Sequence, residues 1–285
     1  MKKNNYAKIN LALNVIDNKK PSNYHELDMI NVTISLKDSV KIKFVKNDLN
    51  ETIIKCSNEN IPVDNTNLVY KVIEKFKKVF SLSFSCFVYI NKKIPVSAGL
   101  AGGSGNASAT LDILDKHFKT NMSLKQKMKF IENITTDGPY MLVSLPCRVK
   151  GNGNVVSPIK YNLKAKIIVV KPKTGCNTKE VFSTLDYKSL KRYNINKIQE
   201  ALNNNDLELL SSHIGNSLLP SAININQDIL DVINRLKTCG FEIVSMSGSG
   251  STCFAISKRK YPFKKAKEIF DKEKYDLIKV CKIIK

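Results

Sequence analysis

Hydrophobic and polar residues along the chain form patterns that predict both strands and helices. Alternation over residues 39–45 predicts a strand with one buried face. Residues 84–90 and 165–171 predict two further strands, and the second is more continuously apolar, as expected of a central strand. Alternation returns at residues 277–284 and predicts a last strand near the end of the chain.

Helical patterns lie between these strands. Residues 67–80 place a hydrophobic side chain at every third or fourth position, which predicts one apolar stripe on a helix. Ser123 followed by Gln126 is the capping-box pattern of a helix start. Gly240 follows another helical stretch as its expected C′ residue, and Pro262 suits the first turn of a further helix.

The order of these elements predicts an α+β fold, because strands and helices mix without strict βαβ alternation. A chain of 285 residues suits one large domain or two smaller ones that share a cleft. The stretch 150–166 is rich in turn-forming residues and is expected to separate two halves. We therefore expect an N-terminal α+β domain at 1–155 and a C-terminal α+β domain at 156–285.

Composition narrows the class of protein. Hydrophobic residues make up 42% of the chain and charged residues 25%, which excludes a disordered or fibrous protein. No apolar run approaches the ~18 residues that a membrane span needs, and the N-terminus lacks the apolar core of a signal peptide. Seven widely spaced cysteines without a CxxC pair indicate neither a zinc ribbon nor a disulfide framework. A cytoplasmic protein without a membrane partner is expected.

The net charge of +21 first suggests a nucleic-acid partner. However, only four of the 46 basic residues are arginine, and the lysines are spread along the whole chain. Abundant Lys, Asn and Ile with little Arg is the composition that an A+T-rich genome produces everywhere. A generally basic surface is therefore favoured over a dedicated nucleic-acid stripe, and such a surface attracts nucleotides.

The segment 92–114 carries the strongest chemical signal. Four glycines fall within seven positions between a predicted strand and a predicted helix: Gly99, Gly102, Gly103 and Gly105. Glycines let the backbone approach a ligand closely, and the N–H groups at a helix N-terminus favour an anion. No GK[ST] follows, and the spacing does not fit GxGxxG, so this is neither a Walker A nor a dinucleotide loop. The pattern predicts a site for a di- or triphosphate, the alternative being a flexible turn before a helix.

A second glycine cluster lies at residues 245–256. Gly248 and Gly250 alternate with Ser and Thr residues before an apolar strand. Alone this pattern is equally typical of a glycine hairpin. Its expected use is to close over a bound ligand or to support the first glycine loop.

Three segments together resemble the GHMP kinase superfamily of small-molecule kinases. They are AKINL at 7–11, the glycine loop from Pro95 to Ser104, and MSGSGSTCFA at 246–255. AKINL with YHEL at 24–27 resembles the branch of that superfamily that acts on 4-diphosphocytidyl-2-C-methyl-D-erythritol. The resemblance covers nearly the whole chain. It implies two α+β halves facing across an active-site cleft, and ATP-dependent, Mg²⁺-assisted phosphorylation of the 2-hydroxyl of that cytidine-diphosphate substrate.

The resemblance also implies a role for each matching residue. Lys8 and Asp137 match the catalytic lysine and aspartate. The implied ATP-binding residues are Pro95, Gly99, Leu100, Gly102, Gly103, Ser104, Gly105 and Asn106 at the phosphates, with Asn67, Leu68 and Lys92 at adenine. The implied substrate-binding residues are Asn10, Tyr24, His25, Thr178 and Phe182, with Tyr24, His25 and Phe182 around the cytosine ring.

These residue types suit phosphoryl transfer, which needs positioning and charge neutralisation more than covalent chemistry. Asp137 could accept the proton of the attacking hydroxyl, and Lys8 could lower the pKa of that hydroxyl and stabilise the transferred oxygens. Ser104 could bond a phosphate oxygen or help to hold Mg²⁺. Lys8 lies within an apolar strand pattern, where a charge should have a reason. Asp137 before Gly-Pro is also a common turn signal.

The sequence departs from the family pattern at three places. TTDGPY at residues 135–140 replaces the usual Gly-Ala/Ser-Asp-Val-Pro-Phe, Asn23 replaces the glycine before Tyr-His, and Gly105 replaces a second loop serine. The change at residues 135–140 adjoins Asp137, so it is expected to affect the turnover rate more than the assignment to this superfamily. Three alternatives stay open: another GHMP kinase acting on mevalonate, homoserine or a sugar, a kinase fold without activity, and a nucleic-acid-binding protein.

Overall fold

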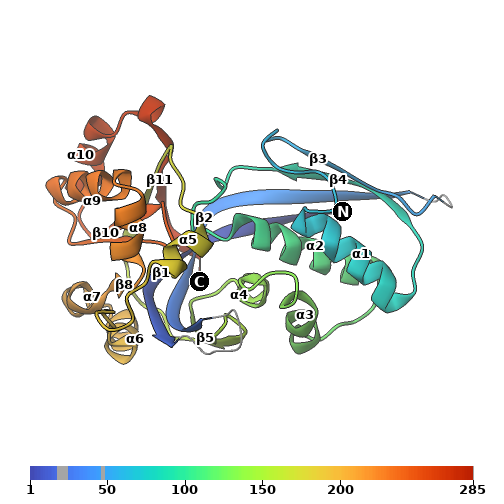
Figure 1. Ribbon diagram of the computed structural model, residues 1–285, viewed down its shortest axis with the longest axis horizontal. Coiled ribbons are helices and arrows are strands. Elements are labelled where there is room, and N and C mark those ends of the chain that lie inside the picture. The colour runs from blue at the N-terminus through green and yellow to red at the C-terminus, as the bar shows by residue number, and fades with distance from the viewer. Residues whose placement is uncertain (18–24, 46–48, 285) are drawn as a thin grey trace. The chain divides into compact units, whose positions relative to one another are not determined.

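The computed structural model describes residues 1–17, 25–45 and 49–284 (Figure 1). Its contacts group into two compact units. The first unit comprises Met1–Ala7, Leu36–Ile94 and Ala101–Ser144, and the second comprises Lys8–Ser35, Pro95–Leu100 and Leu145–Lys285. Strands β1 (Lys2–Asp17) and β2 (Glu26–Val45) contribute residues to both units.

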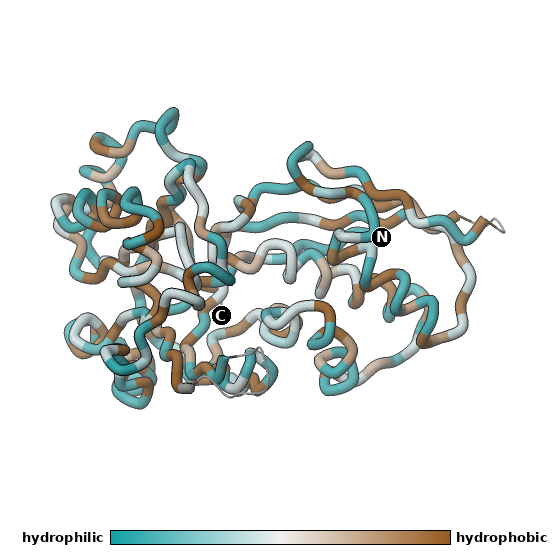
Figure 2. Tube along the Cα trace, in the orientation of Figure 1, coloured by the Kyte–Doolittle hydropathy of each residue, from teal (hydrophilic) through white to brown (hydrophobic). Residues whose placement is uncertain are grey.

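The first unit packs helices on a small mixed sheet. Strand β3 (Thr52–Cys56) runs parallel to β4 (Ser85–Asn91), which pairs antiparallel with the C-terminal part of β2. The helices are α1 (Leu68–Phe80), α2 (Gly102–Phe118), α3 (Leu124–Ile131) and α4 (Gly138–Val143). Buried side chains from β2, β3, β4, α1, α2 and α3 form one core. Figure 2 shows the hydrophobic residues along β3 and β4 that contribute to this core.

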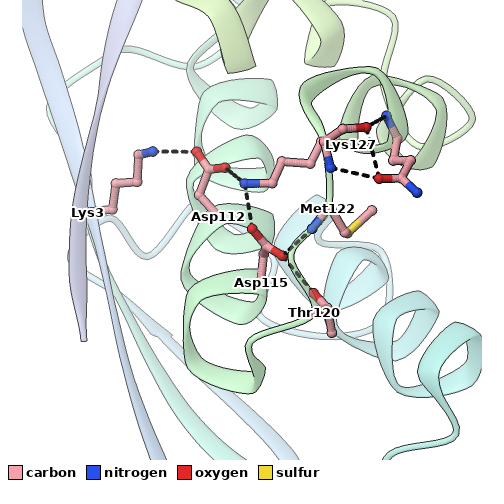
Figure 3. A network of polar contacts seen from close by, with 8 residues as sticks. Lys3, Asp112, Asp115, Thr120, Met122 and Lys127 are labelled. Carbon is pink, nitrogen blue, oxygen red and sulfur yellow. Dashed lines mark hydrogen bonds and ion pairs between the residues drawn. The ribbon is translucent and has the colours of Figure 1, made fainter.

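A charged network fixes α2 within the first unit (Figure 3). The Nζ of Lys127 on α3 lies 2.8 Å from carboxylate oxygens of both Asp112 and Asp115 on α2. Asp112 also pairs with Lys3 on β1, and Asp115 accepts a hydrogen bond of 2.9 Å from the backbone N–H of Met122. Because Lys127, Asp112 and Asp115 are each less than one fifth exposed, their pairs hold α2 more firmly than exposed ion pairs would.

The second unit contains a separate antiparallel sheet in the order β11-β7-β10-β9. These strands are β7 (Lys166–Pro172), β9 (Ile243–Met246), β10 (Cys253–Ser257) and β11 (Tyr275–Cys281). The N-terminal part of β2 pairs with β5 (Cys147–Gly151), which pairs with β6 (Val155–Pro158). Strand β1 pairs with β8 (Gly215–Asn216), and β12 (Ile283–Ile284) pairs with β2. The helices are α5 (Thr178–Ser183), α6 (Ile195–Asn204), α7 (Leu207–His213), α8 (Leu219–Ile225), α9 (Asp228–Thr238) and α10 (Tyr261–Ile269).

The local predictions are confirmed. Helix α1 covers the expected 67–80 almost to the residue, and the capping box of Ser123 and Gln126 is formed at α3. Gly240 follows α9 with φ +86°, and Pro262 lies in the first turn of α10. The four predicted strands fall in β2, β4, β7, and β11 with β12. The mixed α+β class is therefore confirmed, and all seven cysteines are free.

Residues 150–166 lie within the second compact unit. They include β6, which forms a hairpin with β5. The division at residues 1–155 and 156–285 stays a prediction. The compact units are not continuous in sequence, because Lys8–Ser35 belongs to the second unit but lies between two segments of the first. Across the described residues, no helix is both long and apolar enough to cross a membrane.

Candidate active site

The glycine run opens α2 in the first unit. Helix α2 begins at Gly102, and its N-cap, Ala101, has the left-handed φ of 55°. In the part of the chain that the structure describes, no side chain caps this first turn by a hydrogen bond. The N–H groups of the first turn and the positive end of the helix dipole therefore suit an anion.

Two of these glycines are required by close packing. A Cβ on Gly102 would lie 2.8 Å from the Nζ of Lys92, and a Cβ on Gly105 would lie 2.5 Å from the Nδ2 of Asn5. Asn5 thus occupies the space that the usual second loop serine would need. The departure at Gly105 is accommodated by this neighbour, and Gly103 is the more open position, with only Leu68 at 3.5 Å.

Lys92 supports the start of α2 through a buried ion pair. Its Nζ lies 2.7 Å from the Oδ2 of Asp38, and the two side chains are 4% and 0% exposed. The other oxygen of Asp38 accepts hydrogen bonds of 2.6 and 2.7 Å from the backbone N–H groups of Lys93 and Ile94. The structure therefore gives Lys92 a supporting contact under Gly102, and the expected contact of Lys92 with adenine stays a prediction.

Ser104 is joined to the segment that carries Asp137. The hydroxyls of Ser104 and Thr135 lie 2.6 Å apart, and the hydroxyl of Ser108 donates to the carbonyl of Gly138. Asp137 takes the N-cap position of α4 without a capping hydrogen bond from its side chain within the described structure. Thr135, which stands where the family has glycine, therefore gives Ser104 a hydroxyl partner.

The predicted adenine residues lie beside the same loop. Asn67 caps α1, because its Oδ1 accepts from the N–H of Val69 at 2.8 Å while its Nδ2 donates to the carbonyl of Pro62 at 2.6 Å. Leu68 contacts the open side of Gly103. Asn106 is 4% exposed, and its Oδ1 has no hydrogen-bond partner among the described residues. The first unit thus brings together the expected ATP-binding residues from Asn67 to Asn106, except Pro95, Gly99 and Leu100.

Lys8 and Asn10 form a buried polar chain in the second unit. The Nζ of Lys8 donates to the Oδ1 of Asn10 at 2.8 Å, and the Nδ2 of Asn10 donates to the Oδ1 of Asn31 at 2.7 Å. Lys8 is 4% exposed and Asn10 is fully buried. Since an ammonium group is costly to bury, this chain of amides holds Lys8 at a defined place.

The second glycine cluster supports the first part of the loop. Gly99 has φ +68°, and a Cβ there would lie 2.1 Å from the carbonyl oxygen of Ser247. The Ser247 hydroxyl donates to the carbonyl of Gly99 at 2.9 Å, and the N–H of Lys8 donates to the carbonyl of Leu100 at 3.1 Å. The expected supporting role of this cluster is confirmed within the second unit, which also contains Pro95.

Gly99→Ala is expected to lower the free energy of unfolding by about 2–4 kcal/mol. A left-handed φ costs a non-glycine residue ~1 kcal/mol or more, and the clash with backbone adds the ~1–3 kcal/mol typical of overpacking. Urea unfolding measures the change. Gly240→Ala is the matched control, since Gly240 has φ +86° but no atom of the described structure within 4 Å. Equal losses in both variants would contradict the close approach of Gly99 to Ser247.

An aromatic group marks the expected cytosine site in the second unit. The rings of His25 and Phe182 stack with centroids 4.3 Å apart and planes 16° apart. The hydroxyl of Tyr187 lies 2.7 Å from the Nδ1 of His25, and burial lowers the pKa of His25 below its ordinary value. Tyr24 lies outside the described residues. The hydroxyls of Thr178 and Ser249 lie 2.7 Å apart, which connects Thr178 to the second glycine cluster.

Sequence patterns did not indicate three supporting residues: Asp38, Thr135 and Tyr187. Asp38 directly precedes the alternating stretch 39–45 and lies in β2, so the predicted strand did not include it. In the sequence, Thr135 was noted only because it departs from the family pattern, and nothing there indicated its contact with Ser104. Nothing in the local sequence connects Tyr187 with His25, because 162 positions separate them.

Comparisons with known proteins agree with this arrangement. The chain matches the family models for the GHMP kinases N terminal domain at residues 67–140 and GHMP kinases C terminal at residues 198–277. It is 35% identical over 274 residues to a 4-diphosphocytidyl-2-C-methyl-D-erythritol kinase of Clostridium perfringens, covering 94% of each chain. It is 37% identical over 252 residues to a kinase of the same name from Lachnoclostridium phytofermentans, covering 88% of this chain and 86% of that protein.

Solved structures agree on the fold. A crystal structure of 4-(cytidine 5'-diphospho)-2C-methyl-D-erythritol kinase matches with a TM-score of 0.81 and 22% identity over 99% of each chain. Homoserine kinase from Cytophaga hutchinsonii matches with a TM-score of 0.67 and 16% identity over 99% of this chain and 98% of that one. These structures show the same fold, and the two family-model matches together with 35% identity over 94% of the chain establish that it belongs to the GHMP kinase family.

Proposed function

We propose that this protein transfers the γ-phosphoryl group of ATP to the 2-hydroxyl of 4-diphosphocytidyl-2-C-methyl-D-erythritol. Family membership implies ATP as phosphoryl donor. The observation that carries the choice of acceptor is the group of His25, Phe182 and Tyr187, which offers a stacking surface and a polar edge to a pyrimidine. Relatives that cover nearly the whole chain carry the name of that kinase.

The donor phosphates bind at the start of α2 in this proposal. The N–H groups of the first turn face the β and γ phosphates, and Gly103 leaves room for the close approach of an oxygen. The adenine lies along Asn67 and Leu68, beside that position. The buried pair of Lys92 and Asp38 supports the start of α2 at Gly102, and the expected contact of Lys92 with adenine is part of this proposal.

The oxygen groups near Ser104 fit Mg²⁺ bound together with phosphates. No cluster of three or more His, Cys, Asp or Glu side chains suited to a metal occurs in the described residues, so a cage made by the protein alone is not the arrangement. Mg²⁺ commonly takes one carboxylate and keeps water and substrate phosphates as its other ligands. The hydroxyl of Ser104 and the carboxylate of Asp137 are such hard oxygen donors. Mg²⁺ would supply neutralisation of phosphate charge.

The acceptor hydroxyl is activated by Asp137 and Lys8. Asp137 accepts the hydroxyl proton or orients that hydroxyl toward the phosphorus atom. The Lys8 ammonium, held by Asn10, neutralises charge that develops on the transferred oxygens.

The cytidine end binds in the second unit. Stacking of a base on an aromatic ring contributes about 1–3 kcal/mol, and Phe182 supplies that ring. Because the pKa of His25 is lowered by burial, its imidazole is neutral at pH 7. With Nδ1 held by Tyr187, the Nε2 atom is placed to recognise the polar edge of cytosine.

An ADP-release assay tests the proposal directly. Purified protein with ATP and Mg²⁺ should release ADP when 4-diphosphocytidyl-2-C-methyl-D-erythritol is added, and far more slowly with mevalonate, homoserine or galactose. Turnover of one of those alcohols in preference would identify a different GHMP kinase. ATP binding without turnover on any alcohol would identify an inactive kinase and overturn the assignment.

Tyr187→Phe is expected to raise the KM for the cytidine substrate by roughly 2–10-fold, with kcat nearly unchanged. The loss of one neutral hydrogen bond costs about 0.5–1.5 kcal/mol, and the bond in question orients His25 and not the reacting atoms. Steady-state kinetics measures both constants. Tyr261→Phe is the control, because Tyr261 is 63% exposed on α10. A fall in kcat at unchanged KM would remove the orienting role.

The proposal includes a cytoplasmic location and a small-molecule partner. Seven free cysteines, six of them buried, fit a reducing compartment. We expect no nucleic-acid partner, since arginine is scarce and the basic residues are spread along the sequence.

A further inference from the structure

A hollow of about 670 Å³ in the second unit has a strongly cationic lining. It lies between the start of β7, the segment that joins β10 to α10, and the end of β11. Its volume falls in the range of small-molecule sites. None of the candidate active-site residues lines it.

The lining contains six lysines whose side chains make no hydrogen bond or ion pair with any described residue: Lys164, Lys166, Lys260, Lys264, Lys267 and Lys282. Two further cations, Lys258 and Arg259, are bonded to Asn205 and to Glu242 with Gly240. No carboxylate of the described chain is part of the lining. The positive charge in the hollow is therefore largely uncompensated.

Two short-range patterns concentrate this charge. Lys260, Lys264 and Lys267 are spaced by four and three positions, which puts them on one face of α10. Lys164 and Lys166 are both exposed and lie two positions apart, at and just before the start of β7. Like charges at such spacings destabilise a fold by a few tenths of a kcal/mol each, which favours an anion that neutralises them.

The basic composition of the chain does not account for this lining. Basic residues number 46 of 285, which would place about two among thirteen lining residues, whereas eight are found. Acidic residues number 25 of 285, about one in thirteen, and the lining has none among the described residues. The charge is segregated here, in contrast to the spread of lysines along the sequence.

The floor of the hollow is apolar. It consists of Leu163, Ala165, Phe263, Val280 and Ile283. The ring of Phe263 is held edge-on against Phe241, with centroids 4.9 Å apart and planes at 89°. An apolar floor below unpaired cations matches a ligand with one hydrophobic part and one anionic part.

The hollow lies away from Gly248 and Gly250 of the second glycine cluster. On β10, Cys253 lies three positions after Gly250 and pairs with Val170, while Ser257 lies at the other end of the strand and pairs with Lys166 of the hollow. Four residues of strand separate the two ends, which is on the order of 13 Å. A ligand in the hollow would therefore not occupy the place of the phosphoryl acceptor.

We propose that this hollow binds an amphiphilic organic phosphate, that is, a phosphate or diphosphate ester of a hydrophobic alcohol. The anionic group is held by the lysines of α10 and of the 164–166 segment, and the hydrophobic group covers the partly exposed side chains of Ala165, Val280 and Ile283. The ligand is a free molecule, because the lining is concave. Single-stranded nucleic acid fits less well, since Phe263 is only 8% exposed and offers no open stacking surface.

Octyl phosphate, used below its micelle concentration, tests the proposal by isothermal titration calorimetry. It should bind the intact protein at least tenfold more tightly than inorganic phosphate does, and more tightly than hexyl phosphate by roughly fivefold to tenfold for two methylene groups. Equal affinity for inorganic and octyl phosphate would overturn the apolar part of the site. Binding of octanol as tight as that of octyl phosphate would overturn the cationic part.

Charge variants locate the site. Lys260→Gln, Lys264→Gln and Lys267→Gln combined should weaken octyl phosphate binding at least tenfold and leave ADP release unchanged. The matched control combines Lys237→Gln, Lys272→Gln and Lys274→Gln, which remove three charges from exposed positions of the same unit outside the hollow. Equal binding by the two triple variants would overturn the proposal.

Two further experiments distinguish a free ligand from a lipid surface or a nucleic acid as the source of the anionic group. The protein should not sediment with vesicles of phosphatidylcholine and phosphatidic acid at physiological salt, and a single-stranded RNA decamer should not displace octyl phosphate. Sedimentation that only the Lys260, Lys264 and Lys267 variant loses would identify a lipid surface and overturn the free ligand. Displacement by the RNA would overturn it in favour of nucleic acid.

Discussion

Lys8→Met is expected to lower kcat at least ~100-fold while the protein stays folded. Lys8 is 4% exposed in β1, between the buried side chains of Ala7 and Ile9, and its ammonium donates to Asn10. Methionine keeps the length of the side chain and removes the charge, and a buried apolar replacement for a charge is often tolerated. The lost contribution is stabilisation of the transferred oxygens, which a transition state needs more than a ground state does.

Steady-state ADP release measures the loss, with urea unfolding as a check on the fold. Lys2→Met is the matched control, because it makes the same change at an exposed position of the same strand. Asp137→Asn should also lower kcat at least ~100-fold, since it keeps the size of the side chain and removes the base. A rate close to that of the wild type in either variant would remove that residue from the mechanism.

The double variant tests whether Lys8 and Asp137 serve one transition state. Groups that act as a unit give strongly non-additive losses, so the combined variant should be far less impaired than the product of the two single effects. Purely multiplicative losses would mean that the two residues contribute independently.

Local sequence patterns were sufficient to predict several helices and the glycine run that precedes α2. Each rests on a short-range cause: the apolar stripe of α1, the reciprocal hydrogen bonds of Ser123 and Gln126, and the left-handed Gly240 after α9. The glycine run before α2 belongs to the same class, since close packing requires Gly102 and Gly105. Such features depend on a few neighbouring residues, so periodicity and capping rules can predict them.

Periodicity and capping rules could not predict side-chain contacts between segments that are distant in the sequence. The pairs of Asp38 with Lys92 and of Ser104 with Thr135 join residues that lie 54 and 31 positions apart. Their partners are fixed only when the strands and helices have packed, so no periodicity in the sequence reveals them. A charged residue within an apolar strand pattern drew attention to Lys8, but Asp38 lies just outside the predicted strand at residues 39–45.

Asp38→Asn is expected to lower the free energy of unfolding by about 3–5 kcal/mol, the usual cost of breaking a buried ion pair. The amide keeps the shape of the side chain, but it leaves the ammonium of Lys92 without a counter-charge in a site where neither side chain is more than 4% exposed. Urea unfolding measures this change. Asp231→Asn is the control, because the pair of Asp231 with Arg235 is about half exposed and such pairs contribute ~1 kcal/mol or less.

Adding Lys92→Met to Asp38→Asn should restore part of the lost stability, because the buried charge is then removed. A double variant less stable than Asp38→Asn alone would show that Lys92 contributes mainly through its contact with the carbonyl of Ile94 and through packing below Gly102. Restored stability with a raised KM for ATP would show that the pair positions the start of α2 as well as stabilising it. Activity and stability would then depend on the same two side chains, neither of which need touch the nucleotide.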